Sequence, residues 1–165
     1  MKLESLRELF IEELQDLYSA ENQILEALPK VIEKVTSPEL KAGFTEHLAQ
    51  TRGQVRRLDQ IFDELGKGVQ REGKMCKGME GIIKDNRELL KADAVPEVLD
   101  AGLIAGAQRV EHYEIAAYGT VSNYAQLLGR NEWVQLLDQT LNEEKETDKK
   151  LTQLSRQINL EAQAA

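Results

Sequence analysis

Four glutamates lie on faces of the chain that are otherwise apolar, and these residues are the most able to do chemistry. They are Glu21, Glu111, Glu114 and Glu144. Glu21 falls between Leu17 and Ile24 at the spacing of an amphipathic helix, and Glu114 falls likewise between Val110 and Tyr118. A buried carboxylate is costly unless it is paired or bound to a cation, and like charges that converge need a counter-charge. A pair of metal cations would supply that charge.

Further candidate ligands accompany these glutamates. His47, Gln50 and Gln54 follow the apolar stripe of the second amphipathic segment, and Glu143 and Asp148 flank Glu144. Carboxylates with one or two imidazoles suit iron or manganese. The sequence therefore predicts a di-metal centre, with iron favoured and manganese as the alternative. Its candidate ligands are Glu21, His47, Gln50, Glu111, Glu114, Glu143, Glu144 and Asp148. A glutamate at the edge of a stripe can also reach solvent, and that interpretation stays open for each residue taken singly.

The elements that position these residues are predicted to be helices throughout. Apolar residues recur at helical spacing over 3–28 and on past Pro29, then over 38–65, 96–128 and 131–159, with a shorter piece over 79–90. We expect Pro29 to kink its helix and Ser37 to cap the next one. Short connections make each pair of long helices an antiparallel hairpin. The prediction is all-α: an up-and-down four-helix bundle with a long crossover that contains a short extra helix.

This bundle should form one domain over residues 1–160. Its parts are a hairpin over 3–66, a crossover over 67–95 and a hairpin over 96–159, with a frayed tail at 161–165. Gly102 and Gly106 would let another helix approach closely, whereas Cys76 is expected to serve packing alone. Tyr118 is expected to pack rather than to take part in redox chemistry, although a tyrosine beside such a site could hydrogen-bond a ligand.

A shift of 93 residues superposes the two hairpins in part. It aligns Gln15 with Gln108, Leu48 with Leu141 and Leu58 with Leu151. It also pairs Glu21 with Glu114. Two amphipathic hairpins can match by chance, but this pairing supports a site with related contributions from both halves.

Composition excludes several classes of partner. Lys and Arg number 21 against 29 Asp and Glu, so the net charge is -8, which disfavours nucleic acid and anionic membranes. No run of 18 apolar residues could span a bilayer, and Met1-Lys2 leads into an amphipathic segment rather than an apolar signal. Cys76 is the only cysteine, which suits a reducing compartment. The cytoplasm is the expected location.

Five runs of residues resemble a known family. Residues 16–21, 47–54, 75–81, 110–116 and 143–148 are similar to those of the YciF-like bacterial stress proteins. That family is ferritin-like and similar in fold to rubrerythrin, whose doubled glutamate the Glu111-x-x-Glu114 pair resembles. The resemblance implies a homodimeric, cytoplasmic bundle linked to stress, but it implies no established reaction.

The chain also departs from the ferritin-like pattern. Relatives often carry a glutamate at the position of Gln50, and no Glu-x-x-His motif is present. Three functions therefore remain open. The first is a di-metal oxidoreductase or peroxide scavenger, and the second is a structural or interaction protein with a degenerate metal site. The third is an iron-storage cage, which would need assembly far beyond a dimer.

Overall fold

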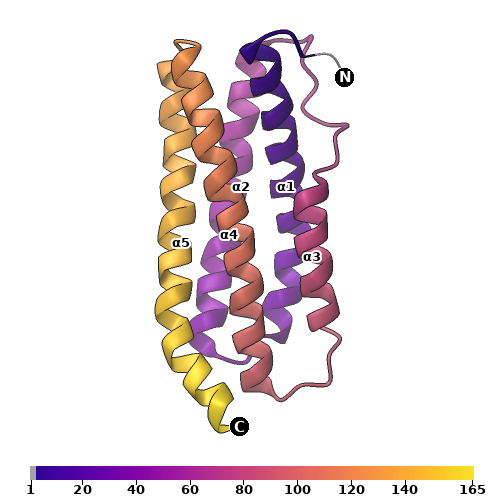
Figure 1. Ribbon diagram of the computed structural model, residues 1–165, viewed down its shortest axis with the longest axis vertical. Helices are drawn as coiled ribbons and strands as arrows, with labels where there is room; N and C mark the ends of the chain where they lie inside the picture. The colour runs from indigo at the N-terminus through magenta and orange to yellow at the C-terminus, as the bar shows by residue number, and fades with distance from the viewer. Residues whose placement is uncertain (1–2) are drawn as a thin grey trace.

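A computed structural model describes residues 3–165 and contains five helices in this part of the chain, with no strand (Figure 1). The helices are α1 (Leu6–Lys34), α2 (Pro38–Leu65), α3 (Lys77–Leu89), α4 (Pro96–Leu127) and α5 (Asn131–Ala164). The predicted all-α class is confirmed. The behaviour of Met1 and Lys2 lies outside the described residues. Within residues 3–165, none of the helices combines the length and the apolar character needed to cross a bilayer.

Local chemistry accounts for most helix ends. The Ser5 and Ser37 side chains accept hydrogen bonds from the backbone N–H of Glu8 and Leu40, so each caps its helix. Pro29 lies inside α1 and does not end it. Gly129 turns the chain between α4 and α5 with a φ of 69°, a value that residues other than glycine rarely adopt.

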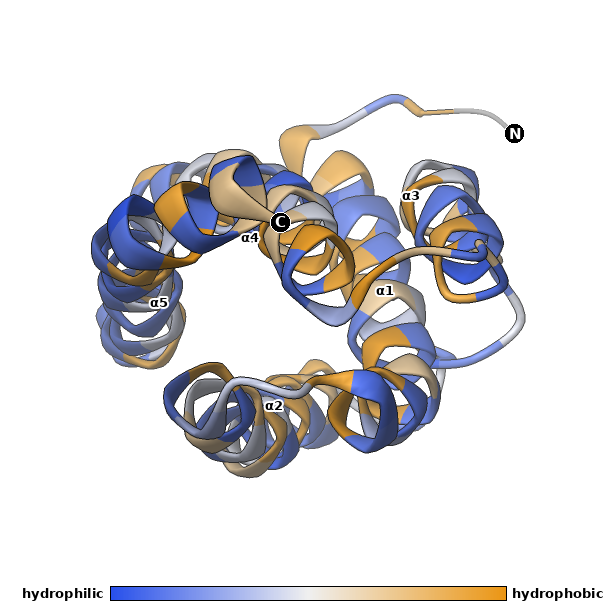
Figure 2. Cartoon of the chain, turned by 90° about the horizontal axis from the view of Figure 1, so that it is seen from below, coloured by the Kyte–Doolittle hydropathy of each residue, from blue (hydrophilic) through white to orange (hydrophobic). Residues whose placement is uncertain are grey.

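The four long helices surround a common core, and α3 lies outside them against α1 and α4 (Figure 2). Neighbouring long helices run in opposite directions, and the crossover descends the length of the bundle from the end of α2 to the start of α4 (Figure 1). This is the predicted ferritin-like arrangement. At the C-terminal end, α5 continues to Ala164 and so includes most of the tail over 161–165. Good helix formers and a hydrogen bond of 2.7 Å between Gln157 and Glu161 support this last turn.

Asp100 fastens the start of α4 to the turn between α1 and α2. Its buried carboxylate accepts hydrogen bonds from the backbone N–H of Thr36 and Ser37, at 3.1 and 2.7 Å, and from the Thr36 hydroxyl at 2.8 Å. The two hairpins are therefore tied together at one end. This tie fixes their relative height, on which the central site depends.

The buried apolar residues form two clusters rather than one. The first cluster lies toward the α1–α2 turn and includes Leu28, Phe44 and Leu103. The second lies toward the opposite end and includes Phe10, where the ring stacks on Trp133 at a centroid distance of 5.5 Å. Between them lies a layer of buried polar side chains, which is the candidate site.

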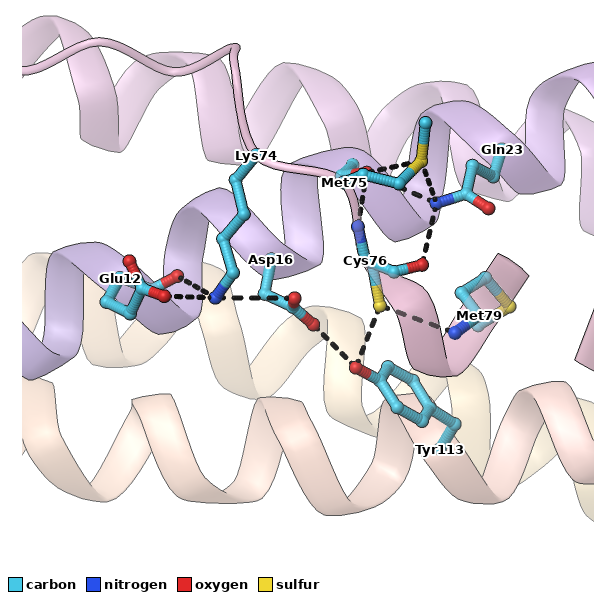
Figure 3. A network of polar contacts seen from close by, with 9 residues as sticks. Glu12, Asp16, Gln23, Lys74, Met75, Cys76, Met79 and Tyr113 are labelled. Carbon is cyan, nitrogen blue, oxygen red and sulfur yellow. Dashed lines mark hydrogen bonds and ion pairs between the residues drawn. The ribbon is translucent and has the colours of Figure 1, made fainter. Parts of the chain in front are cut away.

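The crossover is held against the bundle by a polar network at residues 74–76, just before α3 begins (Figure 3). Cys76 caps α3, and its buried Sγ lies 2.9 Å from the Tyr113 hydroxyl, which in turn donates to Asp16. Lys74 forms ion pairs with Glu12 at 2.5 Å and with Asp16 at 3.4 Å. Cys76 thus does more than the predicted packing, because it joins α3 to both α1 and α4.

Gly102 and Gly106 on α4 allow α3 to approach closely, as the sequence predicts for these two glycines. A Cβ at Gly106 would lie 2.0 Å from Asn86 Oδ1, and one at Gly102 would lie 2.8 Å from Leu89 Cδ2. Neither position has room for a larger residue unless its neighbour moves. The close helix contact predicted at these glycines is therefore made with the crossover helix.

Candidate metal centre

Four buried side chains from three helices meet in the polar layer. They are His47 on α2, Glu111 and Glu114 on α4, and Glu144 on α5. Each offers one ligand atom, and these atoms lie within 4.8 Å of one another. The three glutamates have no exposed surface, and His47 is 2% exposed. The chain therefore concentrates three carboxyl groups and an imidazole in a volume closed to solvent.

Glu21 reaches the same layer from α1. It is fully buried, and the Tyr118 hydroxyl donates a hydrogen bond to its Oε1. The Tyr118 hydroxyl therefore positions a carboxylate, which is the alternative to packing that the sequence left open for this tyrosine. Four carboxyl groups and one histidine thus approach the middle of the bundle from all four long helices, as the repeat that pairs Glu21 with Glu114 suggests.

With the glutamates ionised, most polar atoms of this layer lack a hydrogen-bond partner among residues 3–165, whereas a proton lets Glu111 pair with Glu144 and Glu114 pair with Glu21. Both carboxylate oxygens of Glu111 and of Glu114 are buried without one, as are both nitrogens of His47. His47 Nδ1 lies 3.3 Å from Glu111 Oε1, but the geometry does not form a hydrogen bond. Glu21 and Glu144 each keep one unpartnered oxygen, Oε2. Buried polar groups are nearly always satisfied in native proteins, so these atoms are arranged as cation ligands would be.

Burial changes the acidity of each group. Burial, reinforced by the neighbouring carboxylates, raises the pKa of Glu21, Glu111 and Glu114 well above the ordinary value of 4.5. Burial raises the pKa of Glu144 to about 7 and lowers that of His47 to about 4. Without a cation the glutamates therefore retain protons to a higher pH than exposed ones, while the imidazole stays neutral at pH 7 and able to bind a metal.

Gln54 is a buried member of this layer on α2. Its Nε2 donates to Glu144 Oε1, and the same nitrogen lies 3.2 Å from Glu143 Oε2. Gln54 follows His47 by seven residues, about two helical turns, so it lies on the same face. That spacing explains why the sequence offers Gln54 beside His47, whereas its contact with Glu144 is known only from the structure.

Three predicted ligands lie at the rim of the site. Gln50 is half-buried and accepts a hydrogen bond of 3.3 Å from the Thr147 hydroxyl. Asp148 accepts a hydrogen bond of 3.0 Å from Gln108 and lies 3.3 Å from His112 Nε2. The described contacts of these two side chains therefore point away from the buried cluster.

Glu143 is the third residue at the rim, next to Glu144 in sequence. Arg57 holds it with two hydrogen bonds, one of which spans 2.8 Å from Nη1 to Oε2. Adjacent residues on a helix point about 100° apart, so only one of the two can face the centre. The arginine supplies Glu143 with the positive charge that the buried glutamates lack.

Known proteins share this sequence and fold. The family described as "Domain of unknown function (DUF892)" matches residues 5–164. Protein YciF of Escherichia coli (strain K12) is 42% identical over 155 residues, which cover 94% of this chain and 93% of YciF. The crystal structure of the E. coli stress protein YciF has a TM-score of 0.90 at 41% identity, covering 94% of this chain and 98% of that one.

Two further structures are similar. YcfI from Rhodopseudomonas palustris, provisionally described as a structural protein, is 43% identical with a TM-score of 0.87, over 92% of this chain and 95% of that one. A ferritin-like, diiron-carboxylate protein from Bacillus anthracis str. Ames covers 93% of this chain and 99% of its own. Its TM-score of 0.69 at 17% identity shows a shared fold alone. From the matched residues 5–164 and the identity to YciF over nearly all of both proteins, we conclude that this chain is a YciF-like member of the DUF892 family with a ferritin-like fold.

Proposed function

We propose that this protein binds a pair of iron ions, or manganese ions in their place, in the central layer and reduces an oxidant there as part of a stress response. One observation carries the proposal: with the glutamates ionised, nine side-chain oxygen and nitrogen atoms in the dry centre of the bundle lack a hydrogen-bond partner among the described residues. Glutamate oxygens with a neutral imidazole are the donors that both metals accept. A bound pair would supply a redox couple that gives electrons to the oxidant.

The chain's own residues would prepare the site. Tyr118 and Gln54 hold one oxygen of Glu21 and of Glu144, respectively, and leave the other oxygen free. His47 is neutral at pH 7 because its pKa is about 4. The apolar clusters on either side exclude water from the layer. Ligands that are fixed before binding lose less conformational freedom when a cation arrives.

Anaerobic titration with ferrous ion, followed by hydrogen peroxide, tests this function. We expect about two ions per chain and a ferric absorbance band after peroxide, as carboxylate-bridged iron pairs in such bundles give. Glu114→Ala should lose the band, because both oxygens of Glu114 lie unpartnered in the cluster. Glu146→Ala is the matched control, since Glu146 is an exposed glutamate on α5. Equal bands in the two variants would remove Glu114 from the site.

A second candidate is a structural or interaction protein whose metal site has degenerated. Gln50 presents an amide at the rim, and Glu143 is already neutralised by Arg57, so two predicted ligands are turned to other contacts. The description of YcfI is compatible with this function. Elemental analysis of protein purified without chelators discriminates between the two candidates. Protein free of iron and manganese would favour the structural role.

Assembly and location follow from the family resemblance. We propose a homodimer in the bacterial cytoplasm rather than an iron-storage cage. A sizing column with light scattering measures the mass directly. A mass near twice 18.6 kDa would support the dimer. A cage of many chains would instead support storage.

A further inference from the structure

A small apolar cavity lies beside the candidate metal centre. It has a volume of about 50 Å³ and lies between α1, α2, α3 and α4. Its walls are mainly apolar, with Ile24, Leu28, Phe44, Ile83, Leu103 and Val110 among them. His47 and Glu111 also line it, and because both are buried they form its inner end. Lys30 and Arg87 are exposed and mark its outer side. The cavity therefore connects the surface near α3 with the cluster.

The size and the apolar lining of the cavity determine which molecules could bind in it. A buried water requires two to four polar partners, and between the charged outer side and the inner end the described lining offers a single polar side chain, Asn86. Apolar cavities of roughly 150 Å³ remain dry and accept benzene or xenon. This one has about a third of that volume, so an aromatic or longer organic molecule does not fit. The size and lining suit a diatomic apolar molecule, and dioxygen is the one that a site poised to give up electrons would use.

The outer wall packs closely against α4. Asn86 lines the cavity and is also the residue that a Cβ at Gly106 would strike. Leu89, on the same helix, packs against Gly102 in the same way. The close approach of α3 to α4 therefore holds this wall at a set distance, and the cavity needs no opening motion to exist.

We propose that this cavity under α3 admits dioxygen to the edge of the metal centre formed by His47 and Glu111. The role at the centre rests on the proposed function, but the cavity's affinity for an apolar guest does not. The two can therefore be tested separately.

Xenon, an apolar probe of similar size, tests the cavity in the metal-free protein. Crystals of the full chain under xenon pressure should show one xenon between Ile24 and Leu103. Ala107→Leu should abolish that peak because Ala107 lines the cavity. Ala105→Leu should keep it, because Ala105 is exposed on the same helix. If Ala107→Leu does not fold, Leu90→Phe fills the cavity from the end of α3. The absence of xenon from the wild-type cavity would overturn the proposal.

A second measurement links the cavity to the centre. In protein loaded anaerobically with ferrous ion, Ala107→Leu should slow oxidation by dissolved dioxygen at least about tenfold, a barrier increase of about 1.4 kcal/mol. Ala105→Leu should match the wild type. Equal rates in both variants, with ferrous ion bound, would refute the route while leaving the metal centre intact. Failure of the wild type to bind ferrous ion would instead refute the proposed function, and xenon alone would then decide on the cavity.

Discussion

At the centre of the bundle, Glu21 and Glu144 are each held by a neutral side chain. Tyr118 donates to one oxygen of Glu21, and Gln54 donates to one oxygen of Glu144. The second oxygen of each carboxylate has no partner among residues 3–165. Such supporting contacts orient metal ligands, and their loss typically weakens metal binding by about 10- to 100-fold. Tyr118 should therefore matter to metal affinity although it offers no strong ligand itself.

Tyr118→Phe removes this hydroxyl while keeping the ring. We expect the dissociation constant for manganese or ferrous ion to rise by about 10- to 100-fold, because Glu21 loses the hydrogen bond from the Tyr118 hydroxyl. A competition titration with a coloured chelator measures the constant. Tyr124→Phe is the matched control on the same helix, since the Tyr124 hydroxyl makes no hydrogen bond to the described residues. Equal constants for the two variants would show that Tyr118 only packs.

The metal-free protein should lose stability as the pH rises. The pKa of Glu144 increases from 4.5 to about 7 on folding, so its contribution is complete below pH 4.5 and disappears as the pH passes 7. Glu21, Glu111 and Glu114 shift in the same direction. His47 acts oppositely, because its pKa falls from 6.5 to about 4. The four glutamates outweigh it, and the midpoint of urea unfolding should therefore be lower at about pH 8 than at about pH 5.5.

The matching control for this pH effect is Glu144→Gln, which has no proton to lose. Its midpoint should change less between the two pH values than that of the wild type. Added manganese should also reduce the change, because a bound cation compensates the ionised carboxylates. A wild-type midpoint that is the same at both pH values would contradict the assignment of raised pKa values.

At the scale of the helices, the contact between α3 and α4 depends on glycine. Gly106→Ala should destabilise the protein by about 1–3 kcal/mol, because the new methyl group meets Asn86. Gly119→Ala on the same helix has open space and should instead stabilise it by about 0.5–1 kcal/mol. Urea unfolding monitored by circular dichroism measures both. Effects of the same sign would show that Asn86 moves aside at little cost.

The helices were largely predictable from the sequence because apolar spacing and caps mark them directly. Ser37 followed by Pro38 begins α2, and Gly129 lies in the turn that follows α4, as expected from backbone preferences. The pattern does not determine how far the last turn extends, because good helix formers such as Glu161 and Ala162 are equally common in frayed ends. The site of contact for Gly102 and Gly106 was likewise not predictable, since any helix could approach them.

The centre was predictable where an ionisable residue interrupts an apolar stripe, as His47 does on α2. Glu21, Glu111, Glu114 and Glu144 satisfy that condition, and all four are buried. Glu143 does not satisfy that condition. Its side chain points away from that of Glu144 because adjacent residues on a helix are rotated relative to each other, and because it binds Arg57, which lies 86 residues away in the chain. Long-range contacts of this kind carry no local signal, and this limits what spacing alone can reveal.

On the scale of the whole molecule, the polar layer divides the core into two apolar clusters. Each cluster contains one residue whose signal can report on the unfolding of that cluster. Trp133 belongs to the cluster at the α4–α5 turn, and Cys76 belongs to the other. Because the layer between them contains unpartnered polar atoms, metal-free protein should be weakest at its middle.

Unfolding followed at both probes tests this division. In metal-free protein at about pH 8, Trp133 fluorescence and the reactivity of Cys76 toward a thiol reagent should give different urea midpoints. With manganese bound, the two midpoints should coincide, since the cation would join the halves. Coincident midpoints without metal would show that the layer transmits cooperativity by packing alone.

The position of Cys76 has a consequence for a protein exposed to peroxide. The thiol is fully buried, and burial raises its pKa, so little of the reactive thiolate is present. The folded chain therefore resists sulfenic acid formation and mixed disulfides with glutathione. Met75, the neighbouring residue, is 56% exposed. Oxidative damage should thus begin as a sulfoxide on the crossover, a lesion that reductases can repair, while the chain remains free of covalent cross-links.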